Sequence, residues 1–269
     1  MIGTAIGDIV GSIYEFKGFK TKNFPLYTEA NSYTDDTVMA VAIADAIMHT
    51  ADLYDEIELK VNFIEYMQKY GKAYPYPMGG YGGRFANWLH MTKPQPYNSW
   101  GNGSAMRAAA CGWAADGLEH AELLARYSAE VTHNHPEGIK GAQCTAGCIW
   151  LAKNGFDKAY IRNYVEDRFY HLDGTVDTIR PGYKFNESCQ ETVPQAVIAF
   201  LDSKDFEDAI RNAVSLGGDS DTLAAITGGI AEAYYGVTQE QYKEASEHLD
   251  IDLLGTMLEF ESKYEKRRE

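Results

Sequence analysis

Apolar residues recur every three or four positions along most of the chain, which is the spacing of one face of an α-helix. The period-two alternation typical of strands is not sustained, and strands do not alternate regularly with helices. We therefore expect an all-α protein. The predicted helices cover residues 2–16, 35–50, 55–71, 103–115, 121–132, 136–154, 156–166, 188–201, 206–215, 221–235, 239–248 and 253–266.

No linker divides this helical pattern. No segment rich in Ser, Gly and Pro separates two halves of the chain, and no period typical of a repeat protein is visible. A chain of 269 residues can bury a core without disulfides or structural zinc. We expect one domain over residues 1–269, with loops at the Gly-rich stretches 73–83 and 93–103.

Charge narrows the range of partners. Asp and Glu number 39 against 24 Lys and Arg, which gives a formal net charge of −15. This balance argues against a nucleic acid or an anionic membrane as the main partner. No apolar run reaches the ~18 residues of a transmembrane helix, and residues 1–15 lack the basic start of a signal peptide. We expect no membrane partner.

The cysteines indicate a reducing compartment. None of the four forms a C-x-x-C pair or stands at zinc-binding distance from a histidine along the chain. We expect them to be buried, reduced thiols, which fits a cytoplasmic location.

Two acidic turns stand at predicted helix starts, at residues 34–37 (TDDT) and 219–222 (DSDT). Thr, Ser and Asp also cap helices, so capping alone explains either turn taken singly. However, Asp35 and Asp36 together carry more negative charge than a cap needs. The helix after Asp221 consists of small apolar residues and is predicted to be buried, so carboxylates at its start need compensation. A bound cation would supply it.

The first predicted helix adds a third acid. Gly3, Gly7 and Gly11 recur every four residues and predict close contact with another helix. Asp8, Gly11 and Glu15 share one face, so this contact would bring Glu15 towards the acidic turns. Carboxylates and Thr hydroxyls are hard oxygen donors, which favour Mg²⁺, Mn²⁺ or Ca²⁺ over zinc or copper. The carboxylates suffice for two divalent ions roughly 3.5–4 Å apart.

Rival Asp-rich or helical enzyme classes lack their signatures. A prenyl-diphosphate synthase needs D-D-x-x-D, and Met39 stands where the last acid would be. An HD-type phosphohydrolase needs a His-Asp pair and a zinc deaminase needs C-x-x-C. Neither occurs in the chain.

Six motifs in order along the chain resemble those of the ADP-ribosylglycohydrolase family, of the dinitrogenase-reductase-activating type. They are GDIVG at 7–11 with Glu15, TDDT at 34–37, GYGG at 80–83, GNGSAMR at 101–107, THNHP at 132–136, and GGDSDT at 217–222 continuing through Gly236. The resemblance implies a single-domain orthogonal helical bundle with a dinuclear Mg²⁺ or Mn²⁺ centre.

Residue roles follow from the same resemblance. The implied metal ligands are Thr34, Asp35, Asp36, Asp219, Asp221 and Thr222. The candidate acid–base residues are Asp36 and Glu15, in that order, together with Asp35. The implied ADP-ribose-binding residues are Gly80, Tyr81, Gly82, Gly83, Gly101, Asn102, Gly103, Ser104, Met106 and His133. Arg107 is left open between a phosphate contact and a structural salt bridge.

The resemblance implies a metal-dependent hydrolase of the glycosidic bond between ADP-ribose and a modified group. We expect mono-ADP-ribose on protein arginine as the first substrate, so that the partner is an ADP-ribosylated protein. Serine-linked ADP-ribose, O-acetyl-ADP-ribose, an ADP-ribosylated nucleobase and a free nucleotide metabolite remain open. So does a non-catalytic ADP-ribose-binding protein, because folds are reused for other functions.

Overall fold

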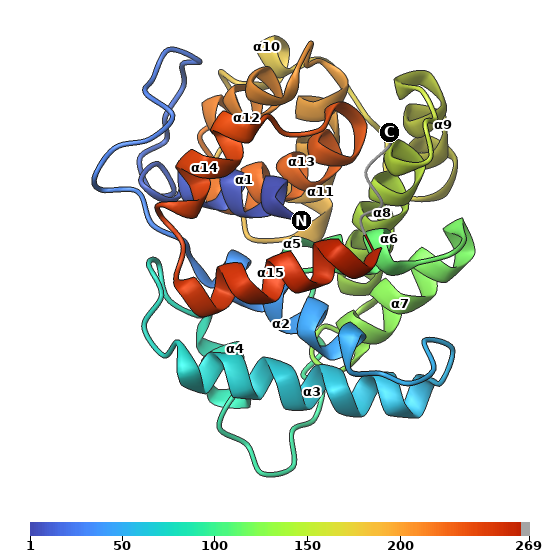
Figure 1. Cartoon of the computed structure of the whole chain (residues 1–269). Coiled ribbons are helices and arrows are strands. Elements are labelled where there is room, and N and C mark those ends of the chain that lie inside the picture. The colour runs from blue at the N-terminus through green and yellow to red at the C-terminus, as the bar shows by residue number, and fades with distance from the viewer. Residues whose placement is uncertain (265–269) are drawn as a thin grey trace.

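The computed structural model of the chain describes residues 1–264, which contain helices and loops and no strand (Figure 1). The helices are α1 (Ile2–Ser12), α2 (Asp35–Met48), α3 (Glu56–Ala73), α4 (Gly83–Trp88), α5 (Gly103–Met106), α6 (Ala109–Ala114), α7 (Leu118–Glu130), α8 (Pro136–Lys153), α9 (Lys158–Arg168), α10 (Val176–Ile179), α11 (Cys189–Leu201), α12 (Phe206–Ser215), α13 (Ser220–Tyr235), α14 (Gln239–Ser246) and α15 (Ile251–Tyr264).

The all-α prediction is confirmed, and most predicted helices lie where the sequence pattern puts them. The short helices α4 and α10 were not predicted. The predicted end of the last helix, Lys266, lies outside the described residues. The extent of one domain over residues 1–269 stays a prediction.

Two predicted helices were wrong in their extent. The first ends at Ser12 rather than residue 16, because the Ser12 hydroxyl donates to the Ile9 carbonyl and the Tyr14 N–H turns back to Gly11. Glu15 therefore lies in the turn that follows α1 and not on the helix.

The predicted helix over residues 103–115 is two helices, α5 and α6, with a break at Arg107. The Arg107 guanidinium donates to the carbonyl of Gly103, which in a continuous helix would accept from the Arg107 backbone N–H. The side chain thus takes the place of a backbone donor.

The close contact predicted from the glycines is made between α1 and α13, which lie side by side near the centre of the molecule (Figure 1). A Cβ atom at Gly7 would lie 1.9 Å from the carbonyl oxygen of Ala224. A Cβ at Gly228 would lie 2.1 Å from the carbonyl oxygen of Gly3. Backbone therefore touches backbone along this pair, and only glycine permits it.

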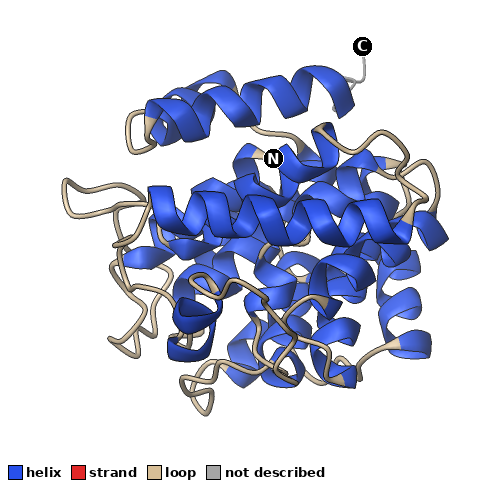
Figure 2. Cartoon of the chain, turned by 90° about the horizontal axis from the view of Figure 1, so that it is seen from below, coloured by secondary structure: helices blue, strands red, loops and turns tan. Residues whose placement is uncertain are grey.

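The other helices pack around this pair. Helix α2 packs on α3 and α15, α7 packs on α8, and α11 and α12 pack on α13. Helix α15 forms an outer layer across α2, seen at the top of Figure 2, and many loops gather on one side of the same view. All four cysteines are buried and free, as expected.

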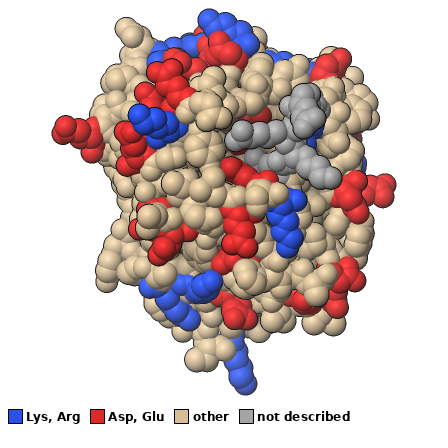
Figure 3. All heavy atoms as spheres, in the orientation of Figure 1, with Lys and Arg blue, Asp and Glu red and all other residues tan. Residues whose placement is uncertain are grey.

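The outer surface carries both charge signs. Asp and Glu side chains are spread over the face shown in Figure 3, with Lys and Arg between them. Within residues 1–264, no helix combines the length and the apolar character needed to cross a membrane.

Candidate active site

The first acidic turn is held in place by α1. Helix α2 begins after Thr34, whose hydroxyl accepts a hydrogen bond from the Asp36 N–H at 3.1 Å. Fully buried Asp8 of α1 accepts from the backbone N–H and the hydroxyl of Thr34, at 2.9 and 2.7 Å. It also accepts from the N–H and hydroxyl of Thr37, at 3.1 and 2.5 Å. Asp8 therefore fixes the start of α2 without facing the cavity.

The second acidic turn meets the first directly. The Thr222 hydroxyl, in the first turn of α13, donates to Asp36 Oδ2 at 3.2 Å. Asp219 stands just before α13 and accepts from the side-chain amide of Asn102 at 2.7 Å. Because α1 packs on α13 and Asp8 holds the start of α2, the turns at residues 34–37 and 219–222 converge.

Glu15 joins this convergence from the turn after α1. One carboxylate oxygen from each of Glu15, Asp219 and Asp221 lies within 4.8 Å of the others, a spacing that could hold a metal ion. Asp36 Oδ1 and Asp221 Oδ1 are buried and have no hydrogen-bond partner among the described residues. Buried polar atoms normally have a partner, so two unpaired carboxylate oxygens on residues that line the same cavity fit a cation.

Burial and mutual repulsion raise the pKa values of these acids. Burial, then the charges of Asp219, Asp8 and Glu187, raises the pKa of Glu15 to about 7. Burial and neighbouring carboxylates raise the pKa of Asp35, Asp36 and Asp221 well above the usual range. The charged cluster is therefore costly by itself, and a bound cation would lower this cost.

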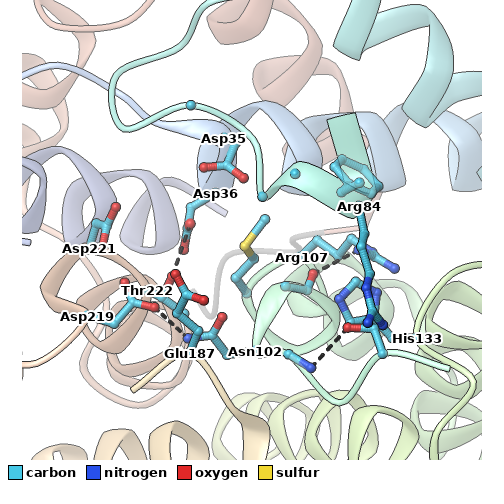
Figure 4. Close-up of a pocket in the computed structure, with 18 of the residues that line it drawn as sticks. Asp35, Asp36, Arg84, Asn102, Arg107, His133, Glu187, Asp219, Asp221 and Thr222 are labelled. Carbon is cyan, nitrogen blue, oxygen red and sulfur yellow. Dashed lines mark hydrogen bonds between the residues drawn. The ribbon is translucent and has the colours of Figure 1, made fainter. Parts of the chain in front are cut away.

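The acidic cluster forms one end of a cavity of about 270 Å³ (Figure 4). This volume is near the lower end of the roughly 300–1,000 Å³ usual for small-molecule sites. Arg84, Arg107 and His133 lie on the opposite side of the cavity from the acids, as Figure 4 shows. The cavity therefore has negatively charged carboxylates at one end and nitrogen hydrogen-bond donors at the other.

The two arginines at the donor end differ in their freedom. Arg107 is 1% exposed and donates to the carbonyls of Gly103 and Ser128 and to the Thr132 hydroxyl. Exposed Arg84 makes no hydrogen bond and no ion pair within residues 1–264. Arg84 is thus free to pair with a ligand, while three of the hydrogen bonds that Arg107 can donate are already made.

Comparison with known proteins identifies the family. The model of the family described as ADP-ribosylglycohydrolase matches residues 1–249. The chain belongs to this family.

Curated relatives of this glycohydrolase span nearly its whole length. ADP-ribosylhydrolase ARH3 of Homo sapiens is 27% identical over 337 residues, which cover 96% of this chain and 91% of the relative. ADP-ribosylarginine hydrolase Tri1 of Pseudomonas putida is 26% identical and covers 88% of this chain and 70% of the relative. A solved structure titled "ADP-ribosylglycohydrolase-related protein complex" superposes with a TM-score of 0.69 at 23% identity, over 96% of this chain and 94% of that one, and shows the shared fold.

Most of the residues singled out in the sequence of this glycohydrolase face the cavity. Those that line it are Glu15, Asp35, Asp36, Gly80, Gly82, Gly83, Gly101, Asn102, Gly103, Met106, His133, Asp219, Asp221 and Thr222. Thr34, Tyr81 and Ser104 lie outside the lining. The hydroxyl of Tyr81 donates to the Tyr74 carbonyl, and that of fully buried Ser104 donates to the Gly138 carbonyl.

The structure also changes the interpretation of two singled-out side chains. The Asn102 amide donates to Asp219 and Thr192, so it orients a cluster carboxylate. Arg107 forms no salt bridge with a carboxylate of residues 1–264, although its side chain reaches the cavity wall. The salt-bridge interpretation of Arg107 is therefore wrong for the described part of the chain.

Two charged residues of the cavity were not singled out. Arg84 follows the Gly-rich loop directly, and a cation at that position was a usable signal. Glu187 lies in the loop before α11, whose sequence carries no motif, and its carbonyl accepts from the Asn102 N–H at 2.7 Å. Only the folded chain shows that Glu187 lines the same cavity as Glu15 and that its charge helps to raise the pKa of Glu15.

Proposed function

We propose that this glycohydrolase cleaves the glycosidic bond that joins ADP-ribose to a modified group, with arginine-linked mono-ADP-ribose on proteins as the first substrate. The similarity to a relative named ADP-ribosylarginine hydrolase supports this choice. An ADP-ribosylated protein is then the partner, and the cytoplasm, with its reduced thiols, is the expected location.

The polarity of the cavity between the acidic cluster and Arg84 carries the proposal. ADP-ribose has a ribose diol at one end and a diphosphate in the middle, so it needs hard cation-linked oxygens at one point and cationic or N–H donors at another. The cavity offers buried, unpaired carboxylate oxygens at Asp36 and Asp221 and a free guanidinium at Arg84 on the far side. We place the distal ribose at the acidic end and the diphosphate towards Arg84.

We propose that two Mg²⁺ or Mn²⁺ ions bind at the acidic end. Their ligands would be Thr34, Asp35, Asp36, Asp219, Asp221 and Thr222. The donor set consists of hard oxygens alone, and the unpaired Asp36 and Asp221 oxygens fit such ions. When bound, divalent cations lower the pKa of water and neutralise charge that develops on oxygen.

Within this site we assign proton transfer to the carboxylates. The bond between ribose C1″ and the leaving nitrogen or oxygen breaks while the oxygen of a water molecule bonds to C1″. Asp36 takes the proton from that water, and Glu15, which also lines the cavity, gives a proton to the leaving group. Asp35, half-buried beside Asp36, is the alternative base. The Gly103 N–H and Arg84 hold the diphosphate, because the N–H groups of Gly101 and Asn102 already donate to the Ser99 hydroxyl and to the Glu187 carbonyl.

The decisive experiment measures free ADP-ribose released from three conjugates. ADP-ribosyl-arginine, ADP-ribosyl-serine and O-acetyl-ADP-ribose are each incubated with Mg²⁺, with Mn²⁺ and with a chelator. We expect release from ADP-ribosyl-arginine with a metal and none with the chelator. Faster release from another conjugate would replace the substrate, and binding without release from any would favour a non-catalytic ADP-ribose-binding protein.

A matched pair of variants tests the site. Asp221→Asn keeps the shape of the side chain and removes a carboxylate from the cluster, so we expect release to be abolished. Asp167→Asn removes an exposed carboxylate of α9, outside the cavity lining, and should leave release unchanged. A folded Asp221→Asn protein with full activity would overturn the site assignment.

A further inference from the structure

His133 presents one ring nitrogen to the cavity and the other to a buried hydrogen-bond chain. The residue follows α7, is 6% exposed and lines the cavity. Its Nε2 faces the Gly-rich turn before α5, where a Cβ at Gly103 would lie 3.3 Å from it and a Cβ at Gly101 3.5 Å. Nε2 has no hydrogen-bond partner within residues 1–264. The other nitrogen, Nδ1, lies 2.7 Å from the Thr132 hydroxyl oxygen.

Arg107 determines which atom donates in each hydrogen bond from Arg107 through Thr132 to His133. A guanidinium can only donate hydrogen bonds, and Arg107 Nη2 lies 2.7 Å from the Thr132 hydroxyl oxygen. The Thr132 hydroxyl is fully buried, and among the described residues its proton has no acceptor other than His133 Nδ1. A buried donor that stays unpaired is costly, so the hydroxyl donates to Nδ1. Nδ1 is then unprotonated, and the ring proton resides on Nε2.

We propose that Arg107 and Thr132 are positioning residues that fix His133 as a neutral imidazole with its proton on Nε2, aimed into the cavity. His133 is thereby committed to donate, and the group it meets must be an oxygen acceptor, namely a hydroxyl or phosphate oxygen of the ligand. The identity of that ligand as ADP-ribose rests on the proposed function. The tautomer rests on the protein alone.

Neighbouring groups keep the hydrogen bonds among Arg107, Thr132 and His133 in this one direction. Arg107 is also tied to the carbonyls of Gly103 and Ser128, both at 2.9 Å, so its orientation does not depend on Thr132. Burial and the nearby guanidinium hold the pKa of His133 well below its usual value. Both nitrogens of an imidazolium carry a proton. A protonated Nδ1 would face the Thr132 hydroxyl, which already donates to that nitrogen, so the charged form is disfavoured.

The tautomer is read directly from ¹⁵N chemical shifts of the histidine rings in the metal-free, ligand-free protein, with His133→Gln used to assign the signal. We expect the shift of an unprotonated nitrogen at Nδ1 and of a protonated nitrogen at Nε2. A protonated Nδ1 in the wild-type protein would overturn the proposal, and no variant is needed for this outcome.

Two substitutions at position 132 separate positioning from packing. Thr132→Ser keeps the hydroxyl, so we expect the wild-type tautomer and the wild-type affinity for ADP-ribose. Thr132→Val keeps the shape and removes the hydroxyl, so we expect signals of both tautomers and affinity about tenfold weaker, as for the loss of one hydrogen bond. A Thr132→Val protein with one unchanged tautomer and unchanged affinity would contradict the role of Thr132.

Thr145→Val is the matched control. Thr145 is a buried threonine of α8 whose hydroxyl donates to the Gly141 carbonyl of the same helix, at 3.0 Å. This substitution carries a similar burial cost and should move neither the His133 shifts nor the affinity. If the wild-type protein fails to bind ADP-ribose at all, the proposed function fails, while the ¹⁵N shifts still decide the tautomer.

Discussion

Thr34 donates two hydrogen bonds to Asp8, one from its backbone N–H and one from its hydroxyl, so the residue that caps α2 is held against α1. Helix α1 is in turn pressed against α13 at Gly7. The two acidic turns therefore depend on a single helix, which touches α13 by backbone and α2 by one buried carboxylate. The site is an outcome of how α1 packs.

Asp8→Asn tests this dependence. The carboxylate accepts four hydrogen bonds from Thr34 and Thr37, whereas an amide has one acceptor oxygen and places N–H groups against other donors. We expect the free energy of unfolding to fall by about 1–3 kcal/mol and metal-dependent ADP-ribose release to fall with it. Urea unfolding measures the first effect, with Asp167→Asn as the control. Unchanged stability and activity would show that Asp8 does not organise the turn.

Gly7→Ala tests the contact between α1 and α13. A Cβ 1.9 Å from the Ala224 carbonyl oxygen forces the two helices apart, so we expect a loss of about 3 kcal/mol or more in unfolding free energy. Gly255→Ala in α15 is the matched control, since no atom lies within 4 Å of its Cβ position. Because Gly255 lies in a helix, where alanine is favoured, the Gly255→Ala protein should gain about 0.5–1 kcal/mol in unfolding free energy. Equal effects in both variants would contradict the close contact.

The stability of the metal-free protein should depend on pH. The pKa of Glu15 is raised from 4.5 to about 7, so the folded protein binds this proton more tightly than the unfolded chain does. Its contribution is therefore fully present below the unfolded pKa and is lost as pH rises through about 7. The raised pKa values of Asp36 and Asp221 act in the same direction.

Thermal unfolding with a chelator, followed from about pH 5 to about pH 8, measures this loss. We expect Mg²⁺ or Mn²⁺ to restore the melting temperature at the upper end, because a cation replaces the missing protons. Asp36→Asn removes one repelling charge and should flatten the profile. A melting temperature that rises steadily with pH in the chelator would contradict a destabilising acidic cluster.

The sequence was sufficient for the contact between α1 and α13, because glycine every fourth residue has a direct packing meaning that Gly7 fulfils. It was also sufficient to predict acids at two helix starts, because caps and charges are local features. It could not show that the Arg107 guanidinium replaces a backbone donor at Gly103 and joins Ser128 and Thr132. That arrangement depends on the contact between α5 and α7, which no local sequence pattern predicts.

The positions of residues in loops were the second feature that the sequence could not predict. Glu187 reaches the cavity because the Asn102 N–H pairs with its carbonyl, a contact between segments far apart in sequence. Glu15 was expected on a helix and lies in a turn, yet it still joins Asp219 and Asp221. Its position is set by where α1 ends, which the helical period alone does not fix.

Arg84 should supply the unpaired cation that binds the ligand's diphosphate. It lines the cavity on the side opposite the acids and has no ion pair within residues 1–264, whereas Arg107 is tied to three protein groups. We expect Arg84→Gln to weaken ADP-ribose binding about tenfold, in the range of one charge-assisted hydrogen bond. Arg84→Lys should retain part of the affinity, because a point charge replaces the planar fork.

Isothermal titration calorimetry at two salt concentrations checks this prediction. Wild-type affinity should fall with added salt, and the Arg84→Gln protein should lose part of that dependence because one screened charge pair is gone. Arg162→Gln, on the partly exposed side of α9 and outside the cavity, controls for the loss of a positive charge. If the Arg84 and Arg162 variants bind ADP-ribose equally well and with the same salt dependence, the diphosphate does not lie against Arg84.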